Sequence, residues 1–459
     1  MMETADRTLA LAEFVSALTL ERVPADAQDR LKQCLLDFIG VSAFAAVQAE
    51  SSGPFRQAVL SLAPRPGPGT VVGEARGYPF QYAALLNGAF AHTLDFDDTN
   101  LFGALHPGAP VIPAALAMAE QEGASGARFL EALAAGYEVA CRVGAALGQT
   151  AYDRGFHITA VAGIFGAVAA GAKVLGLDPP RTVDAFGIAL SQAAGSMQYL
   201  ENGAWTKRLH PGFAAHDALM SLALARAGVR GAARPIDGRY GLLTGYSNAP
   251  TPEHLVDRLG EHWALTGTAI KPYPSCRLAH GAIDAALSLR DRAAADARER
   301  ATVEIRLSPK GYQIVGEALP QKVHPRNIVE GQFSVYFQTA VAWLDGRVDW
   351  ASYERVGDGR VHALMERIHV KADETIPLAG AEVVVTVDGQ ELRARVEQPL
   401  GEPERPVPWD LLETKFSGLA SGVLGTARAR RVITTVRAIE TEPTVPRWAR
   451  SLRAGGRGR

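Results

Sequence analysis

The sequence predicts a mainly helical protein, with a large helical domain built from both chain ends and a smaller α+β domain between them. Three observations support this prediction. Residues 9–224 are rich in Ala, Leu and Gly with apolar residues at helical spacing, short β-rich stretches lie within residues 265–399, and helical periodicity returns after them. We therefore expect a helical domain over residues 1–264, an α+β domain over 265–399 and a return to the helical domain over 400–459.

Short Gly and Pro turns close the helical segments of the first part. Segments 127–147 and 160–175 have apolar residues at helical spacing and are followed by Gly148 and Gly176. The uncharged runs 158–172 and 185–200 are shorter than the roughly 20 residues that span a bilayer, so we expect buried core helices and no membrane span. Charged residues among the apolar positions of the first 22 residues are typical of an amphipathic helix, not of a signal peptide.

The middle part contains alternating patterns typical of strands. Residues 301–307 and 368–372 are candidates, and residues 382–396 predict a hairpin because Asp388-Gly389 suits the positive φ angles of a type I′ turn. At the other end of the chain, five arginines lie between residues 447 and 459. We expect this basic tail to be flexible.

Composition narrows the class of protein. The chain has 459 residues, of which 47% are hydrophobic and 21% charged, with a net charge of −2. Because no basic stripe accompanies this neutral balance, we expect no nucleic-acid partner. The three cysteines lie far apart, which predicts neither a disulfide framework nor a thiolate zinc site and fits a reducing, cytoplasmic compartment.

One short stretch concentrates ionisable side chains at the end of an apolar run. Residues 92–100 read His-Thr-Leu-Asp-Phe-Asp-Asp-Thr-Asn, and His106 follows shortly. On a helix, Asp95 would share a face with Asp98 and Thr99 while Asp97 would point elsewhere. Such a group is either a solvated helix exit, a metal site or a proton-transfer site, and spacing alone leaves these alternatives open.

Three later segments carry further candidates for chemistry. One histidine opens an apolar helix, a lysine and a histidine lie three residues apart, and a loop with two prolines presents two cations and a phenol, an arrangement that suits carboxylate or phosphate groups. A core histidine and scattered surface cations are the alternatives. The residues are His157, Lys207, His210, Lys271, Tyr273 and Arg277.

Taken in order, these motifs resemble the MmgE/PrpD family. The resemblance rests on Asn87-Gly88, the stretch from His92 to Thr99, His106-Pro107, the segments around His157 and Lys207, and Lys271-x-Tyr273-Pro274-Ser275-Cys276. It implies an all-helical domain made of both chain ends, an α+β lid, a homodimer and an active site with neither cofactor nor metal. The family includes 2-methylcitrate dehydratase, cis-aconitate decarboxylase and iminodisuccinate epimerase.

The resemblance also assigns residues to the site. Six positions match the active site of the decarboxylase branch: Asp95, Thr99, His106, His157, Lys207 and Lys271. Two departures concern Ile158, where proline is usual, and Phe337, which takes the place of a site tyrosine one residue after Tyr336. The loop of residues 100–105 is also one residue longer than expected.

The predicted chemistry builds negative charge on a carbon next to a carboxylate. Lysine ammonium groups would stabilise that charge, His106 and His157 would exchange protons, Asp95 would orient an imidazole and Thr99 would bind a carboxylate. We predict that the remaining substrate contacts come from Tyr273, Arg277 and His210.

Several reactions fit this site. Dehydration of a small hydroxy-polycarboxylate is the first choice, and decarboxylation of an unsaturated tricarboxylate and epimerisation are the alternatives. A non-catalytic carboxylate-binding protein is more distant. A magnesium-dependent prenyl-type enzyme would need a second carboxylate-rich patch, which the sequence lacks.

Overall fold

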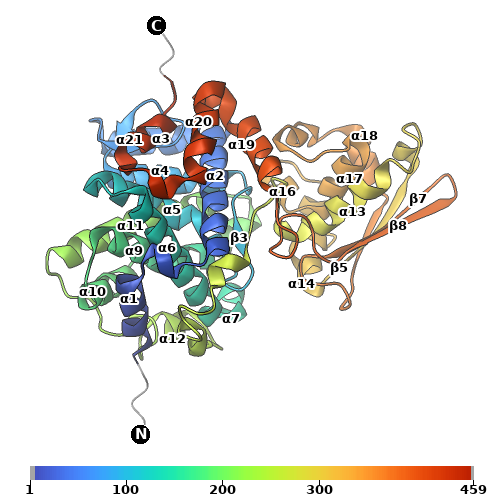
Figure 1. Cartoon of the computed structure of the whole chain (residues 1–459). Coiled ribbons are helices and arrows are strands. Elements are labelled where there is room, and N and C mark those ends of the chain that lie inside the picture. The colour runs from blue at the N-terminus through green and yellow to red at the C-terminus, as the bar shows by residue number, and fades with distance from the viewer. Residues whose placement is uncertain (1–5, 456–459) are drawn as a thin grey trace. The chain divides into compact units, whose positions relative to one another are not determined.

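A computed structural model describes residues 6–455, and they form two compact units. The first unit contains residues 1–270 and 408–459, and the second contains residues 271–407 (Figure 1). The units are defined by contacts within each of them. The sequence predicted domain limits after residues 264 and 399. These limits refer to independently folding domains, and they stay predictions.

The first unit is a bundle of helices around a buried centre. Its central helices are α4 (Phe80–Thr93), α5 (Gly108–Glu122), α6 (Gly126–Leu147), α9 (Gly163–Leu175) and α11 (Thr206–Arg226). Helix α9 packs against α5, α6 and α11, and α4 packs against α5 and α11. Ala and Gly along these helices leave little side-chain volume, so the helix axes approach closely.

Local sequence signals begin and end these helices. Ser125 accepts a hydrogen bond from the Arg128 backbone N–H at the start of α6, as an N-cap residue does. Helix α10 (Pro179–Leu190) starts with Asp178 as its N-cap, followed by two prolines. The helix ends at Leu190, so the uncharged run 185–200 is not one helix and that expectation was wrong; the chain turns there, with Gly195 at φ 147°.

Two segments of the bundle have the length and apolar composition of membrane-crossing helices. They are Ala25–Gln48, which is α2, and Ile158–Leu175, which contains α8 (Ile158–Val161) and α9. Most of their apolar windows, 78% and 94%, are buried inside the fold. Burial in the bundle accounts for this composition, as predicted for the run that starts at Ile158.

The chain returns to the first unit after the second. Helices α19 (Trp409–Leu424) and α20 (Thr426–Arg437) pack against α2 (Figure 1), and α21 (Val445–Ala449) packs against α5. The expectation of a flexible tail from residue 447 was wrong for residues 447–455, because the side chains of Trp448 and Leu452 are buried in the bundle. Residues 456–459 lie outside the described residues.

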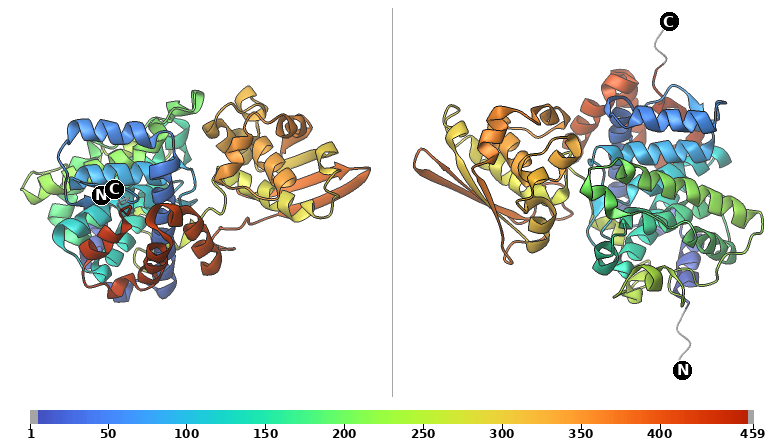
Figure 2. Two further views of the ribbon diagram at one scale, coloured as in Figure 1. Left: turned by 90° about the horizontal axis from the view of Figure 1, so that it is seen from above. Right: turned by 180° about the vertical axis from the view of Figure 1, so that it is seen from behind.

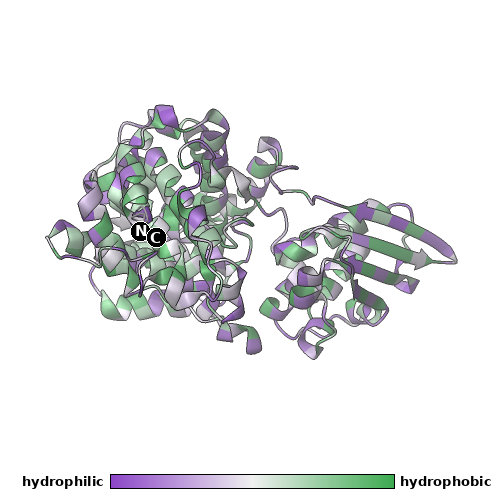
Figure 3. Cartoon of the chain, turned by 90° about the horizontal axis from the view of Figure 1, so that it is seen from below, coloured by the Kyte–Doolittle hydropathy of each residue, from purple (hydrophilic) through white to green (hydrophobic). Residues whose placement is uncertain are grey.

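The second unit combines a four-stranded sheet with helices. The strand order is β6 (Ile368–Ala372), β5 (Thr302–Leu307), β7 (Ala381–Val387) and β8 (Gln390–Val396), with β5 and β6 parallel and the other pairs antiparallel. Figure 3 shows hydrophobic and hydrophilic residues in turn along these strands. Asp388 and Gly389 have φ angles of 47° and 80°, which confirms the predicted turn between β7 and β8.

Helices cover one face of this sheet (Figure 2). Helix α13 (His280–Arg290) packs on β7 and β8, and α17 (Val335–Asp345) packs on α13. Trp343 and Phe337 are fully buried among the apolar residues between these layers. The structure thus confirms the mainly helical fold class, with an α+β unit between two stretches of the helical one.

Candidate active site

Five segments of the first unit bring the predicted site residues together. They are the end of α4 with His92, the loop of residues 94–98, β3 (Thr99–Asn100), the turn before α5 with His106, and the residue before α8, His157. Helix α11 adds Lys207 and His210 from its first turns. Helices α4 and α11 lie side by side, because Gly88 and Gly212 let their backbones touch.

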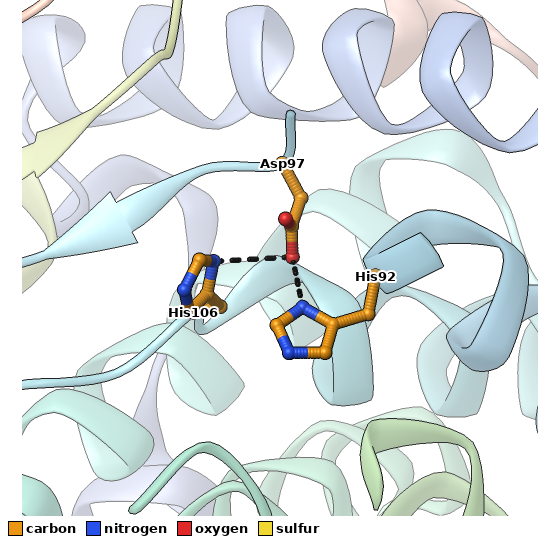
Figure 4. A group of neighbouring side chains, drawn as sticks. All are labelled: His92, Asp97 and His106. Atoms are coloured by element: carbon orange, nitrogen blue, oxygen red, sulfur yellow. Dashed lines mark hydrogen bonds and ion pairs between the residues drawn. The ribbon is translucent and has the colours of Figure 1, made fainter. Parts of the chain in front are cut away.

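Asp97 links two imidazoles (Figure 4). Its Oδ2 atom lies 2.7 Å from Nδ1 of His92 and 3.2 Å from Nδ1 of His106. The two rings meet edge to face with centroids 4.7 Å apart. An ionised carboxylate only accepts hydrogen bonds, so it directs a proton to Nδ1 of His92 and leaves the Nε2 lone pair. The same contact orients His106.

A second pair of imidazoles lies next to the first. Nδ1 of His157 and Nδ1 of His210 are 3.0 Å apart, so one ring donates a proton and the other accepts it. The His157 ring also stacks on His92 with centroids 5.5 Å apart, and Tyr199 contacts both His157 and His210 edge to face. Four imidazoles therefore form one continuous group.

Lys207 places an ammonium group at this site. Its Nζ donates to Oδ1 of Asp95 at 2.8 Å, and both side chains are buried. Asp95 has φ 51°, in the left-handed region that a non-glycine residue rarely adopts. Helix α4 ends at Thr93, so the expected helical face shared by Asp95, Asp98 and Thr99 does not exist.

Asp98 turns away from the imidazoles. It accepts hydrogen bonds from the hydroxyl of Tyr137 at 2.6 Å and from the backbone N–H of Gly108 at 3.0 Å. Burial raises the pKa of Asp98 to about 7, against the lowering effect of the Tyr137 hydrogen bond. Asp98 thereby ties the loop that carries Asp97 to the turn that carries His106.

Burial disfavours the charged form of three of the imidazoles in the ligand-free site. It lowers the pKa of His92 to about 4, and it lowers that of His210 to about 4, with help from the charges of His92 and Lys207. Burial, and then the neighbouring imidazoles and Lys207, hold the pKa of His157 well below its ordinary value. Asp97 stays ionised, because His106 and His92 outweigh burial and keep its pKa well below the usual range.

His92, Asp97 and His106 also have the residue types of a metal site. One ligand atom each from His92, Asp97 and His106 lies within 4.8 Å of the others. A cation bonded to two of them at about 2.1 Å would hold those atoms more than about 3 Å apart, whereas His92 Nδ1 and Asp97 Oδ2 are 2.7 Å apart. These two atoms therefore cannot both bind one ion while their hydrogen bond is kept, and the hydrogen-bonded pair is an arrangement suited to proton exchange.

Three predicted ligands belong to the second unit. Lys271 is buried there, the hydroxyl of Tyr273 donates to Asp284 at 2.6 Å, and Arg277 faces the carboxylate of Glu402 through two of its nitrogens. Burial lowers the pKa of Arg277 to about 9. Their roles toward a substrate stay predictions, as does that of Thr99, which lies in β3 of the first unit.

One departure noted in the sequence, that of Phe337 and Tyr336, lies in the second unit. Phe337 is fully buried against Tyr353, and the hydroxyl of Tyr336 donates to the carbonyl of Gly316 at 2.9 Å. Neither side chain is given a role in the site.

Sequence reasoning gave no role to two central residues. His92 stood in the motif without a function, and Asp97 was expected to point away, yet Asp97 is the carboxylate between His92 and His106. The predicted orientation of an imidazole by Asp95 stays a prediction, because the contact seen for Asp95 is with Lys207. The density of acids and imidazoles in residues 92–106 was the signal that could have indicated Asp97.

Two family models and several known proteins match nearly the whole chain in sequence. The model of the MmgE/PrpD N-terminal domain matches residues 9–255, and that of the MmgE/PrpD C-terminal domain matches residues 273–441. The cis-aconitate decarboxylase-like protein oryM of Aspergillus oryzae is 31% identical, covering 95% of each chain. A cis-aconitate decarboxylase of Aspergillus terreus is 28% identical over 93% of this chain and 91% of its own, and that of Homo sapiens is 29% identical over 79% and 77%.

Proposed function

Because the chain belongs to the MmgE/PrpD family, we propose that it is a cofactor-independent lyase that removes carbon dioxide from a small unsaturated tricarboxylate of the cis-aconitate type. The observation that carries this proposal is the buried Lys207 ammonium beside four contacting imidazoles. The names of three relatives favour decarboxylation over dehydration, which the sequence alone placed first.

The reaction needs a fixed positive charge. When the bond to the departing carboxylate breaks, its electron pair stays on the carbon framework and spreads toward a neighbouring carboxylate. A preorganised ammonium in a site shielded from water stabilises this charge far better than it would in bulk water. We assign this role to Lys207, with Asp95 holding the ammonium in place until substrate arrives, and Lys271, Tyr273, Arg277 and Thr99 as further carboxylate ligands.

The reaction also consumes one proton, which a protonated imidazole delivers to carbon. Burial lowers the pKa of His157 in the ligand-free site, but a bound polyanion favours the charged form of its neighbours and raises their pKa. His106 and His157 are the two proposed donors of this proton. Asp97 orients His106, and His210 orients His157 through the Nδ1 contact.

Mass spectrometry in heavy water tests the proposal. With cis-aconitate, we expect loss of the mass of carbon dioxide and one new carbon-bound deuterium in the product. A change by the mass of water would support a dehydratase-type reaction, and deuterium exchange without loss of a fragment would support epimerisation. Binding without any turnover, measured by thermal shift, would support a carboxylate-binding protein and overturn the proposal.

Substitutions test the assigned roles. We expect His106→Gln and His157→Gln each to lower the rate of carbon dioxide release by about 10²–10⁴-fold, which is the usual effect of losing a general acid or base. His262→Gln is the matched control, because His262 is exposed and its side chain lies outside the imidazole group. Wild-type turnover in both site variants would contradict the assignment.

We also propose that the protein is a cytoplasmic homodimer, as the resemblance and the cysteine content led us to expect. Sedimentation equilibrium of the purified full-length chain measures the oligomeric state, and a monomer at micromolar concentration would overturn the dimer. Fractionation of cells that express the chain tests the compartment.

A further inference from the structure

A lysine from the C-terminal stretch contacts the loop that carries the site carboxylates. Nζ of Lys415, on α19, donates to the backbone carbonyl of Phe96 at 3.1 Å and lies 3.5 Å from the centroid of the Phe96 ring. It also pairs with Oδ1 of Asp37, on α2, at 2.5 Å. The Lys415 side chain is 10% exposed and that of Asp37 is 1% exposed.

Phe96 stands between the two carboxylates that engage the site. Asp95 binds Lys207, and Asp97 binds His92 and His106, so the residue between them turns toward the scaffold. The backbone there includes the left-handed Asp95, a conformation that persists only when surrounding contacts hold it. Lys415 contacts both the backbone carbonyl and the ring of Phe96, so it fixes the backbone of the loop at Phe96.

Packing of α19 on α2 does not by itself need a buried ammonium group. Burying a lysine costs desolvation energy, and apolar residues of similar size usually fill such a place at least as well. The C-terminal stretch has another ion pair to α2, from Glu440 to Lys32 at 2.8 Å, which makes no contact with the loop. What distinguishes Lys415 is therefore that it binds the carbonyl and the ring of Phe96.

We infer that Lys415 is a positioning residue of the active site, which sets the orientation of Asp95 and Asp97 through Phe96. Its contribution to turnover rests on the proposed function. Its effect on the imidazoles does not, because Asp97 contacts His92 and His106 whatever the substrate is.

The experiment compares two ion pairs in the full-length protein. Asp37→Asn combined with Lys415→Met removes the contacts with Phe96 together with both charges of this ion pair, which is expected to destabilise the fold less than removal of one partner alone. Lys32→Met removes the other tie between α2 and the C-terminal stretch and is the matched control. Lys415→Arg restores a charged donor next to Asp37.

Two readouts are measured on each variant. The first is kcat and KM for carbon dioxide release from cis-aconitate. The second is the long-range proton–nitrogen spectrum of ¹⁵N-histidine-labelled protein, with His92 and His106 assigned from their Gln variants. In the double variant we expect kcat to fall by about 10²-fold, as for a displacement of about 1 Å, with both ring signals shifted. Lys32→Met is expected to match the wild type, and Lys415→Arg to recover part of kcat.

Each result has a clear meaning. Unshifted ring signals in the double variant, or an equal loss of kcat in Lys32→Met, would overturn the inference and leave Lys415 a merely structural residue. If wild-type protein releases no carbon dioxide, the proposed function fails, and the ring signals still decide the role of Lys415. A variant that loses its melting transition is replaced by Phe96→Leu, in which the same ring signals are expected to shift.

Discussion

Four imidazoles in a contacting chain cannot all carry a positive charge, because each added charge repels the next. The structure resolves this by giving one acceptor, Asp97, to His92 and His106 and by pairing His157 with His210. Burial then keeps His92, His157 and His210 in the neutral form. The site is thus prepared to take up protons when a polyanion binds, which is the state that a proton donor needs.

The neutral state of His92 has a cost that depends on pH. The pKa of His92 is about 4 in the folded protein, against 6.5 for an ordinary histidine. Between pH 6.5 and pH 4, the histidine is therefore protonated in the unfolded chain and neutral in the folded one. Stability must therefore fall as pH drops through this window. We expect the unfolding free energy of the wild type, relative to His92→Gln, to fall by about 3 kcal/mol between pH 7 and pH 4.

Urea unfolding at several pH values measures this difference, followed by circular dichroism and tryptophan fluorescence to separate the transitions of the two units. His262→Gln serves as the control and is expected to follow the wild type. A constant difference between wild type and His92→Gln from pH 7 to pH 4 would show that His92 is not held neutral.

Removal of divalent cations is expected to leave turnover unchanged. The proposed roles of His106, His157 and Lys207 need no ion, and the 2.7 Å contact between His92 and Asp97 is that of a hydrogen bond. Dialysis against EDTA, followed by the carbon dioxide assay, checks this expectation. A loss of rate that added Zn²⁺ or Mg²⁺ restores would contradict it and would make His92, Asp97 and His106 the first candidate ligands.

Much of the site was predictable at this scale. Asp95, His106, His157, Lys207 and His210 were all singled out from sequence, and they lie in one unit with one connected group of imidazoles and the Lys207–Asp95 pair. The partner of each carboxylate was not predictable, because it depends on a left-handed Asp95 and on Lys415, which lies far along the chain.

At the scale of elements, the site depends on how closely α4 and α11 approach. Helix α4 carries His92 at its end, and α11 carries Lys207 and His210 near its start. The helices touch at two glycines, since a Cβ atom on Gly212 would lie 2.3 Å from the carbonyl oxygen of Leu85 on α4. The close spacing of α4 and α11 therefore depends on glycine, which has no side chain, at positions 88 and 212.

Gly212→Ala is expected to push these helices apart. Overpacking of this kind costs about 1–3 kcal/mol of stability, and a shift of about 1 Å in the site costs about 10²-fold in rate. Thermal unfolding and kcat measure the two effects. Gly422→Ala on α19, where nothing lies within 4 Å of the new Cβ, is the control and should be neutral or stabilising by about 0.5–1 kcal/mol. Wild-type stability and rate in Gly212→Ala would contradict this account.

Helices were easier to predict than their ends. Periodicity identified α6 and α9 with Gly148 and Gly176 after them, and Asp388-Gly389 identified the hairpin. The apolar run 185–200 was misleading, because its second half is uncharged but is mostly not buried and forms a turn and a short 3₁₀ helix, Met197–Glu201, after α10. The spacing of apolar residues indicates which face of a helix is buried. Only capping residues and helix breakers indicate where the helix ends.

At the scale of the whole molecule, the first unit is completed by residues that follow the second unit in the chain. The returning stretch contributes Phe416, which packs against Gly40 of α2, and Trp448, which packs against Phe129 of α6. Composition indicated this return, but the register of α19 on α2 could not be predicted. It depends on the fit of single side chains at a contact between residues far apart in sequence.

Truncation tests how far the first unit depends on this return. A chain of residues 1–407 lacks the buried side chains of Leu412, Phe416, Val432, Trp448 and Leu452. Each such side chain contributes about 1.5–3 kcal/mol, which together is comparable to the whole stability of an ordinary domain, about 5–15 kcal/mol. We expect the truncated chain to be insoluble or unfolded, as judged by circular dichroism, and co-expression of residues 408–459 as a separate chain to restore a soluble complex. A folded, monomeric 1–407 chain with an unchanged melting temperature would show that the bundle is complete without its C-terminal helices.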